Sequence, residues 1–289
     1  VILLEKDKIC HSVTANTTGK ITSQHGLFYH YLISNFGKEF AKKYLESHNN
    51  AISFIYETMQ KEKIDCDFEW QPNYVYTNSD EKLQEIKLEV GSVNSLGFPA
   101  TFCEKTDLPF KIKGAICFPN QAMFHARKYC IGLAHTLPNN TIFENSRVID
   151  LEKQLNQYVV KTESGSVCAN YVVMASHYPI CNFPGLYFLK MYQDKSYLIG
   201  VDTKKDLFPG MYISVEEPTF SFRSALSPSG KRILLVGGNS HKTGDNSICM
   251  DDCFKPLEDM AHSLYAKSDV LYRWSTEDCV TLDKVPYIG

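Results

Sequence analysis

The sequence predicts an α/β protein built from two interwoven domains. Helical and strand-like patterns alternate along its 289 residues, and the strand-rich stretches are not contiguous. A chain of this length has room for one or two domains of ordinary size. Two sequential domains would each keep their strands together, so the alternation favours domains that exchange segments.

Apolar side chains at helical spacing predict the helices. In residues 37–65, the apolar positions between Phe40 and Met59 lie four or seven residues apart. Ser79 followed by acidic residues marks the start of a second helix that ends near residue 96. Two more helices are predicted over residues 120–137 and over residues 256–266, the latter with Pro256 at its start.

Short apolar or alternating stretches predict the strands. Val1–Glu5 is a buried strand whose last residue is a carboxylate, and residues 10–26 form a loop rich in Thr, Ser, Asn and Gly. A turn at residues 163–166 separates two strands. The polar residues 273–279 are expected to form a loop that leads to Pro286. The strands predicted after residue 150 cover 158–162, 171–175, 191–201, 210–216 and 232–236.

Composition excludes several classes of protein. Thirty Lys and Arg residues against 33 Asp and Glu give a net charge of −3, which argues against a nucleic-acid binder. The longest apolar run is Tyr171–Ala175, far short of the roughly 20 residues that a membrane span requires. The nine histidines and ten cysteines show no ligand spacing, so no metal site is predicted.

Two segments carry residues suited to a nucleotide ligand. A strand that ends in a carboxylate, as at Glu5, can bind the ribose of a dinucleotide, although a solvated strand end looks the same. The Gly-x-Gly-x-x-Gly motif that completes such a site does not occur in the chain. Hydroxyls, Gly19 and Lys20 in the Thr-rich loop can surround phosphate oxygens, as can many unrelated loops.

The order of these features resembles a known family. Val1–Glu5, Thr14–Gly26, the strand meander from Val148 to Ala175, and Pro286–Gly289 follow one another as in the D-amino-acid-oxidase-like (DAO) family of FAD-dependent oxidoreductases. Residues 22–27 and 273–279 resemble the branch of that family in which a C-terminal Rieske iron–sulfur domain follows the oxidoreductase domain.

The resemblance implies a fold and a domain division. We expect a truncated Rossmann-like FAD/NAD(P)-binding domain interwoven with an α+β substrate domain on a mixed sheet. The FAD-binding domain would comprise residues 1–67, 119–183 and 251–289, and the substrate domain residues 68–118 and 184–250. The chain is expected to be an internal fragment that lacks the Gly-rich FAD loop and the Rieske domain.

Candidate site residues follow from the same resemblance. Arg223 and His241 are candidate substrate-binding residues, with a surface arginine and a plain turn as the alternatives. His125 and Arg127 are expected to pack or to cap a helix. No catalytic residue is predicted. The expected FAD-binding residues are Glu5, Lys6, Thr14, Thr17, Thr18, Gly19, Lys20, Val148, Ala175, Ser176, Pro286, Ile288 and Gly289.

The function expected from the resemblance is oxidation of an amine or amino-acid-like small molecule. FAD would be bound in the full-length parent protein, and electrons would pass to an iron–sulfur centre or another acceptor. A 2Fe–2S cluster would belong only to a missing C-terminal domain. The alternative is a catalytically inactive nucleotide-binding or scaffold fragment. An RNA-modifying flavoenzyme is disfavoured by the charge, and a cytoplasmic protein without a nucleic-acid partner or membrane span is expected.

Overall fold

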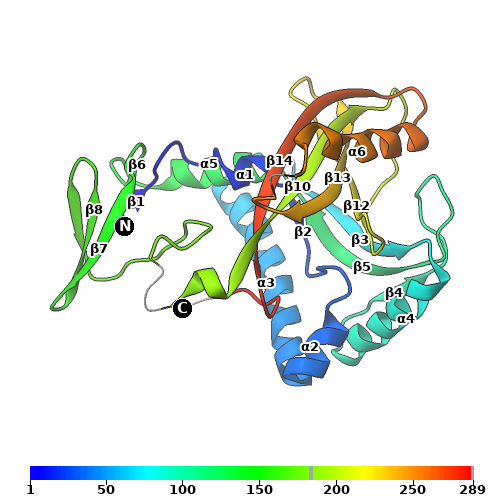
Figure 1. Cartoon of the computed structure of the whole chain (residues 1–289), viewed down its shortest axis with the longest axis horizontal. Coiled ribbons are helices and arrows are strands. Elements are labelled where there is room, and N and C mark those ends of the chain that lie inside the picture. Colours follow the sequence, from blue (N-terminus) through cyan, green and yellow to red (C-terminus); the bar gives the residue numbers. More distant parts are fainter. Residues whose placement is uncertain (182–184, 246, 288–289) are drawn as a thin grey trace.

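The structure is a computed structural model that describes residues 1–181, 185–245 and 247–287. A large sheet with helices packed against it occupies the right of Figure 1, and two small sheets lie to the left. The helices are α1 (Val13–Asn16), α2 (Tyr29–Phe36), α3 (Lys38–Glu62), α4 (Asp80–Ser95), α5 (Ala126–Thr136) and α6 (Met250–Leu264), with a 3-10 turn at Tyr187–Leu189.

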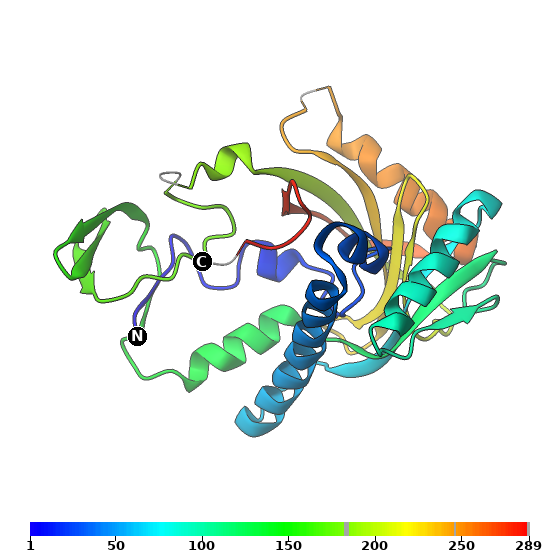
Figure 2. The ribbon, with the colours of Figure 1, turned by 90° about the horizontal axis from the view of Figure 1, so that it is seen from below.

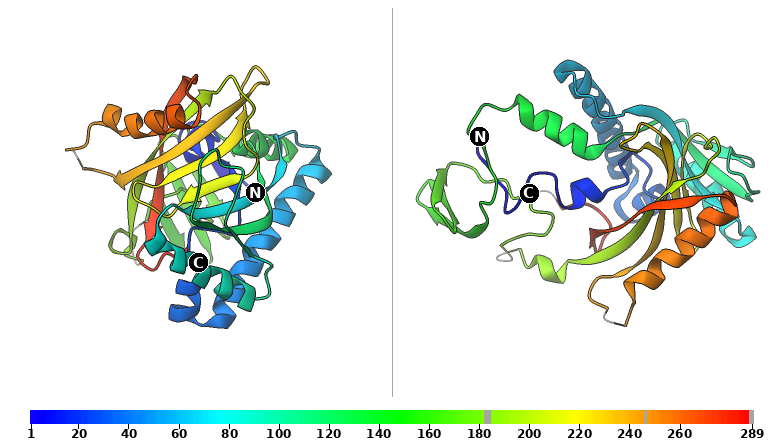
Figure 3. Two further views of the ribbon diagram at one scale, coloured as in Figure 1. Left: turned by 90° about the vertical axis from the view of Figure 1, so that its right-hand side faces the viewer. Right: turned by 90° about the horizontal axis from the view of Figure 1, so that it is seen from above.

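The large sheet has nine strands and is mixed. Its order is β14-β10-β13-β12-β11-β3-β5-β2, and β4 also pairs with β5. Strands β11 and β3 run parallel, whereas their neighbours are antiparallel. The sheet is strongly curved (Figures 2 and 3). Its strands are β2 (Lys20–Ile21), β3 (Glu69–Thr77), β4 (Thr101–Cys103), β5 (Gly114–Met123), β10 (Met191–Asp202), β11 (Met211–Ser214), β12 (Phe220–Leu226), β13 (Arg232–Lys242) and β14 (Asp269–Thr281).

The two small sheets hold the remaining strands. Strand β1 (Leu3–Leu4) pairs in parallel with β6 (Ile142–Phe143). Strands β7 (Val148–Gln154), β8 (Gln157–Thr162) and β9 (Ser166–Ala169) form an antiparallel meander. The predicted mixed α/β architecture is confirmed. No helix in the described part of the chain is long and apolar enough to cross a membrane.

The core lies on both faces of the large sheet. Because successive side chains of a strand point to opposite faces, Val75 packs with α2, α3 and α4 while Tyr76 packs in the other cluster. That second cluster includes Leu257 and Ala261 of α6, which cover β10 and β13. Both Val75 and Tyr76 are at most 1% exposed, so the strand is sandwiched at this point.

Most helices form where the sequence predicts them. Helix α3 matches the prediction for residues 37–65, and Ser79 caps α4 by accepting a hydrogen bond from the Glu81 backbone N–H. The prediction for residues 120–137 is wrong at its start, because residues 120–123 continue β5 and pair with β3. The prediction that Pro256 begins a helix is also wrong, because α6 begins at Met250 and Pro256 lies inside it.

Three strand and loop predictions also need correction. Residues 171–175 form no strand: β9 occupies the place beside β8, and Tyr171 and Val173 are each 89% exposed. The predicted loop at 273–279 is part of β14, whose polar residues pair with β10. The loop at 10–26 contains α1 and β2, and α2 was not predicted. The strand at β1 is confirmed, but its Leu3 is 40% exposed rather than buried.

The large sheet groups the chain differently from the predicted domains. Strand β14 hydrogen-bonds to β10 along its length, and α6 packs on β10 and β13. Residues 251–281 therefore lie with the predicted substrate domain rather than with β1 and β6. The domain boundaries themselves remain a prediction.

A buried carboxylate fixes α2 against α4. Glu89 of α4 is 1% exposed and accepts three backbone hydrogen bonds at the start of α2, from the N–H groups of Phe28, Tyr29 and His30 at 2.6–2.8 Å. These N–H groups have no partner within the helix, and the positive end of the helix dipole favours a carboxylate here. Burial nevertheless raises the pKa of Glu89 above its usual value.

We predict that Glu89→Gln lowers the free energy of unfolding by about 2 kcal/mol, because the amide NH₂ cannot accept the His30 N–H bond. Urea denaturation measures the change. Glu85→Gln, on the exposed face of the same helix, is the control and should leave the stability unchanged. Equal effects of the two substitutions would contradict the role given to Glu89.

Candidate functional site

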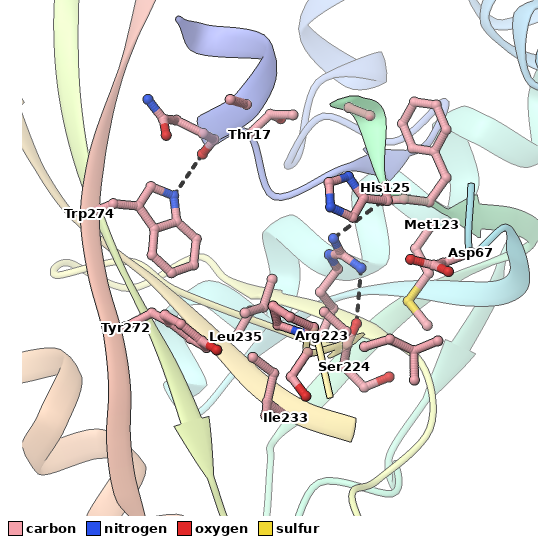
Figure 4. Close-up of a pocket in the computed structure, with 18 of the residues that line it drawn as sticks. Thr17, Asp67, Met123, His125, Arg223, Ser224, Ile233, Leu235, Tyr272 and Trp274 are labelled. Carbon is pink, nitrogen blue, oxygen red and sulfur yellow. Dashed lines mark hydrogen bonds between the residues drawn. The ribbon is translucent and has the colours of Figure 1, made fainter. Parts of the chain in front are cut away.

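A pocket of about 400 Å³ opens on the inner side of the curved sheet. This volume falls in the range of small-ligand sites. Strands β12, β13 and β14 form one side of the pocket, and α1 together with the end of β5 forms the other (Figure 4). The side chains labelled there are Thr17, Asp67, Met123, His125, Arg223, Ser224, Ile233, Leu235, Tyr272 and Trp274.

Arg223 is the most unusual of these residues. It lies in the middle of β12 and is only 7% exposed. Its Nη1 donates to the Ser224 carbonyl at 2.9 Å and its Nη2 to the Phe124 carbonyl at 3.4 Å, while the buried Nε has no partner among the described residues. Burial lowers the pKa of Arg223 to about 10, so the guanidinium remains charged at neutral pH.

The carboxylates nearest Arg223 are bonded to other cations. Both oxygens of Asp67 accept from Lys128 at 2.8 Å. Glu69 pairs with Arg232 of β13. No salt bridge to Arg223 occurs within the described ranges, so its charge is available to an anion in the pocket.

Lys20 is a second cation beside Arg223. Its Nζ donates to the Tyr212 carbonyl of β11 at 2.9 Å and to Ser221 Oγ of β12 at 2.7 Å. In the strand order, β11 and β12 are three and four places away from β2. At about 4.8 Å per strand, a flat sheet would put them beyond the reach of a lysine side chain. The sheet therefore curls until its edge strand faces its middle.

Gly19 lets β2 approach Arg223. Its φ is +66°, and a Cβ there would lie 2.3 Å from the Phe124 carbonyl oxygen and 3.1 Å from Arg223 Nη2. The Phe124 N–H in turn donates to the Gly19 carbonyl at 3.0 Å. Only glycine combines this conformation with this clearance.

A further part of the pocket wall comes from α1 and β14. Trp274 Nε1 donates to the Asn16 carbonyl at 2.9 Å and holds α1 against β14. Thr14 and Thr17 of this segment line the pocket, as do Tyr272 and Trp274, which share a face of β14 because they are two residues apart.

The structure brings together only some of the predicted site residues. Thr14, Thr17 and Arg223 line one pocket, and Gly19 touches it through Arg223. Thr18 follows Thr17 but is not part of the lining, and the Lys20 ammonium points toward β11 and β12 rather than into the cavity.

The other predicted FAD-binding residues lie away from this pocket. Glu5 follows β1 and accepts a hydrogen bond from the Asp7 N–H at 2.9 Å, and the exposed Lys6 forms an ion pair with Asp7. Val148 begins β7. Ala175, Ser176 and Pro286 are exposed, whereas Ile288 and Gly289 lie outside the described residues.

His241 is also remote from Arg223. It lies near the end of β13, outside the lining of the pocket, where its Nε2 shares a hydrogen bond of 2.8 Å with the Tyr197 hydroxyl. Its Nδ1 faces the Lys242 carbonyl at 2.9 Å. Nothing in this environment favours contact with a ligand beside Arg223.

Sequence reasoning missed several residues that line the pocket. His125 was expected to cap or pack, and its Nδ1 does accept from the Lys128 N–H at the start of α5. It also faces the cavity, and burial lowers its pKa. Tyr272 and Trp274 were hidden by the prediction of a loop, although their alternation with polar residues was a usable signal. No sequence pattern marked Asp67 or Glu69 as residues of the pocket.

Comparison with known proteins decides the family. The profile of the family described as FAD dependent oxidoreductase (DAO) matches residues 1–289. The chain belongs to the DAO family of FAD-dependent oxidoreductases. It is 32% identical over 291 residues to a protein of Bacillus subtilis named putative Rieske 2Fe-2S iron-sulfur protein YhfW. The match covers 100% of this chain and 57% of that relative, so the chain spans little more than half of its length.

Several solved structures share the fold. Glycine oxidase from Geobacillus kaustophilus superposes with a TM-score of 0.78 at 18% identity, over 100% of this chain and 78% of that one. An L-amino acid deaminase from Proteus vulgaris gives a TM-score of 0.74 at 14% identity, over 100% and 74% of the two chains. The expected fold class is thereby confirmed.

We predict that Gly19→Ala destabilises the protein far more than Gly26→Ala. Both glycines have positive φ, but a Cβ at Gly26 has nothing within 4 Å. The conformational cost alone is about 1–2 kcal/mol at each position, and the clash with Phe124 adds to it only at Gly19. Chemical denaturation of both variants measures the difference. Equal losses would show that β2 does not need its close approach to β5.

Proposed function

We propose that this chain forms the substrate pocket of an FAD-dependent oxidoreductase that oxidises an amine or amino-acid-like substrate, with Arg223 binding the substrate carboxylate. The observation that carries the proposal is a buried guanidinium that faces a ligand-sized cavity without a carboxylate partner of its own. A planar guanidinium binds a carboxylate through two parallel hydrogen bonds, and such bonds are strong when they are shielded from water.

The pocket supplies orientation and shielding to such a substrate. Arg223 would hold the carboxylate, and the rings of Tyr272 and Trp274 in the lining would help to exclude water. Burial lowers the pKa of His125, which favours its neutral form, and its ring offers a nitrogen to a polar group of the substrate. Such a site orients its substrate and leaves the redox chemistry to the cofactor.

FAD fits the donor set around the pocket. The Arg223 guanidinium and the hydroxyls of Thr14 and Thr17 give the pocket polar groups that suit the polar edge of a flat ring system. When bound, FAD supplies the two-electron oxidation of the substrate C–N bond. We propose that it is held by the residues expected from the sequence, Glu5, Lys6, Thr14, Thr17, Thr18, Gly19, Lys20, Val148, Ala175, Ser176, Pro286, Ile288 and Gly289.

An iron–sulfur centre is the proposed electron acceptor in the full-length parent protein. The support is twofold: the Bacillus subtilis relative is named as a putative Rieske 2Fe-2S iron-sulfur protein, and this chain spans only 57% of that relative. The described residues contain no group of three or more His, Cys, Asp or Glu side chains that could hold a metal ion. We propose that such a cluster would lie in sequence outside this chain.

The second candidate is a catalytically inactive nucleotide-binding or scaffold fragment. The absence of a Gly-x-Gly-x-x-Gly motif from the sequence favours weak FAD binding by the chain on its own, because a glycine-rich turn and a helix N-terminus normally bind the pyrophosphate.

We predict that the full-length parent protein copurifies with FAD and that an amino acid substrate bleaches the flavin absorbance under anaerobic conditions. Absorbance spectroscopy measures both. Parent protein that binds FAD but is bleached only by dithionite, across a panel of amino acids and amines, would favour the inactive alternative.

We predict that Arg223→Met weakens binding of anthranilate by at least roughly 30-fold, since losing one member of a buried charge pair costs about 2–5 kcal/mol. Anthranilate is a suitable probe because a structurally similar L-amino acid deaminase from Proteus myxofaciens was solved in complex with it. Aniline, which lacks the carboxylate, is the matched control ligand and should bind both proteins alike. Equal loss of both ligands would argue against a carboxylate on Arg223.

A further inference from the structure

Lys20 contacts the strand that carries the anion-binding residue. Ser221 and Arg223 are two residues apart in β12, so both side chains lie on the same face of the strand. Lys20 Nζ donates to Ser221 Oγ at 2.7 Å and to the Tyr212 carbonyl at 2.9 Å. Its neighbour Gly19 lies against Arg223 Nη2. Gly19 thus lies against the Arg223 side chain, while Lys20 bonds to a side chain two residues from it on the same face of β12.

Arg223 in turn reaches back to the strand that pairs with Lys20. Its Nη2 donates to the carbonyl of Phe124, the residue that follows β5, while Lys20 pairs with Met123 of β5. The two cations therefore form reciprocal links across the curve of the sheet. Lys20 joins β2 to β11 and β12, and Arg223 joins β12 to the end of β5.

In the described part of the chain, one charged side chain acts on the Lys20 ammonium. Arg223 of β12 is the charged group that acts on its ammonium. Strands β11 and β5 present the Tyr212 carbonyl and Met123, neither of which titrates. The carboxylates of Asp67 and Glu69 lie nearer to Arg223 and are paired with Lys128 and Arg232.

We propose that Lys20 is a positioning residue that holds Arg223 toward the pocket and that its charge sets the affinity of the pocket for a carboxylate. The inference rests on the proposed function, because it takes the ligand of Arg223 to be a carboxylate. The positioning role and the charge of Lys20 can be tested separately. A neutral amine keeps two N–H groups, so both hydrogen bonds of Lys20 survive loss of its proton.

The direction of the pH effect follows from the environment of Lys20. Burial, together with the neighbouring Arg223 guanidinium, lowers the pKa of Lys20 to about 7. Below this pH two positive charges flank the site, and above it only Arg223 is charged. An anion is therefore bound more tightly at pH 6 than at pH 8, and anion binding raises the pKa of Lys20 in return.

His125 is the other group in the pocket that titrates near neutral pH. Burial lowers its pKa below the usual value of 6.5, although Asp67 opposes the shift. The pH dependence is assigned to Lys20, so a His125→Asn variant should retain it.

The experiment is a calorimetric titration of the chain with sodium acetate at constant ionic strength between pH 6 and pH 8. For the wild-type chain we expect the dissociation constant to rise roughly threefold to tenfold over this range, as a change of about half to one unit in the Lys20 pKa implies. Lys20→Met should bind acetate weakly and equally at both pH values. Lys20→Arg should keep the tighter binding at both, because its charge does not titrate.

Lys43→Met is the matched control. Lys43 is an exposed lysine of α3 that pairs with Glu39, and its loss should leave the wild-type pH profile intact. Thermal unfolding of each variant checks that the fold is retained, and Lys20→Arg provides the test if Lys20→Met does not fold.

The outcomes distinguish this inference from the proposed function. A pH profile that persists in Lys20→Met or Lys20→Arg overturns the role of Lys20 while leaving the carboxylate site intact. A wild-type chain that binds no acetate at any pH overturns the carboxylate site itself, and the inference with it.

Discussion

The curl of the large sheet is the constraint on which the site depends. A flat nine-stranded sheet would separate β2 from β12 by the width of four strands, yet Lys20 of β2 bonds to Ser221 of β12. Arg223 completes the closure through the Phe124 carbonyl, and Gly19 provides the clearance that the contact requires. Without the curl, α1 and the end of β5 would not face β12 and β14, and there would be no pocket between them.

The closure leaves an electrostatic imbalance at the pocket. Two cations lie beside each other, and the nearest carboxylates are already paired with Lys128 and Arg232. Buried charges are normally compensated, since desolvating an unpaired charge is costly. A ligand carboxylate would compensate this one, which ties the stability of the curled sheet to the presence of the ligand. The chain belongs to the DAO family of FAD-dependent oxidoreductases, and the ligand that we propose for this site is an amine or amino-acid-like substrate.

Local signals predicted the local structure. The spacing of apolar residues in α3 and the Ser79 cap of α4 act within a few residues of sequence, and both elements form as predicted. The apolar run at 171–175 misled because a strand needs a partner, and β9 takes the place beside β8. Strand β14 was missed for the converse reason: its polar residues are extended only because β10 pairs with them.

The candidate site shows the same division. Arg223 was selected by its position in a family pattern, whereas the pocket joins residues from five distant parts of the chain, among them Asp67, His125 and Trp274, which no local pattern connects. The measurement that tests the central claim most directly is the melting temperature of the chain in sodium acetate against sodium chloride of equal ionic strength. If Lys20 and Arg223 form a cation pair that a bound carboxylate compensates, acetate raises the melting temperature of the wild-type chain but not of Arg223→Met. No rise in the wild type, or an equal rise in both proteins, would contradict the account.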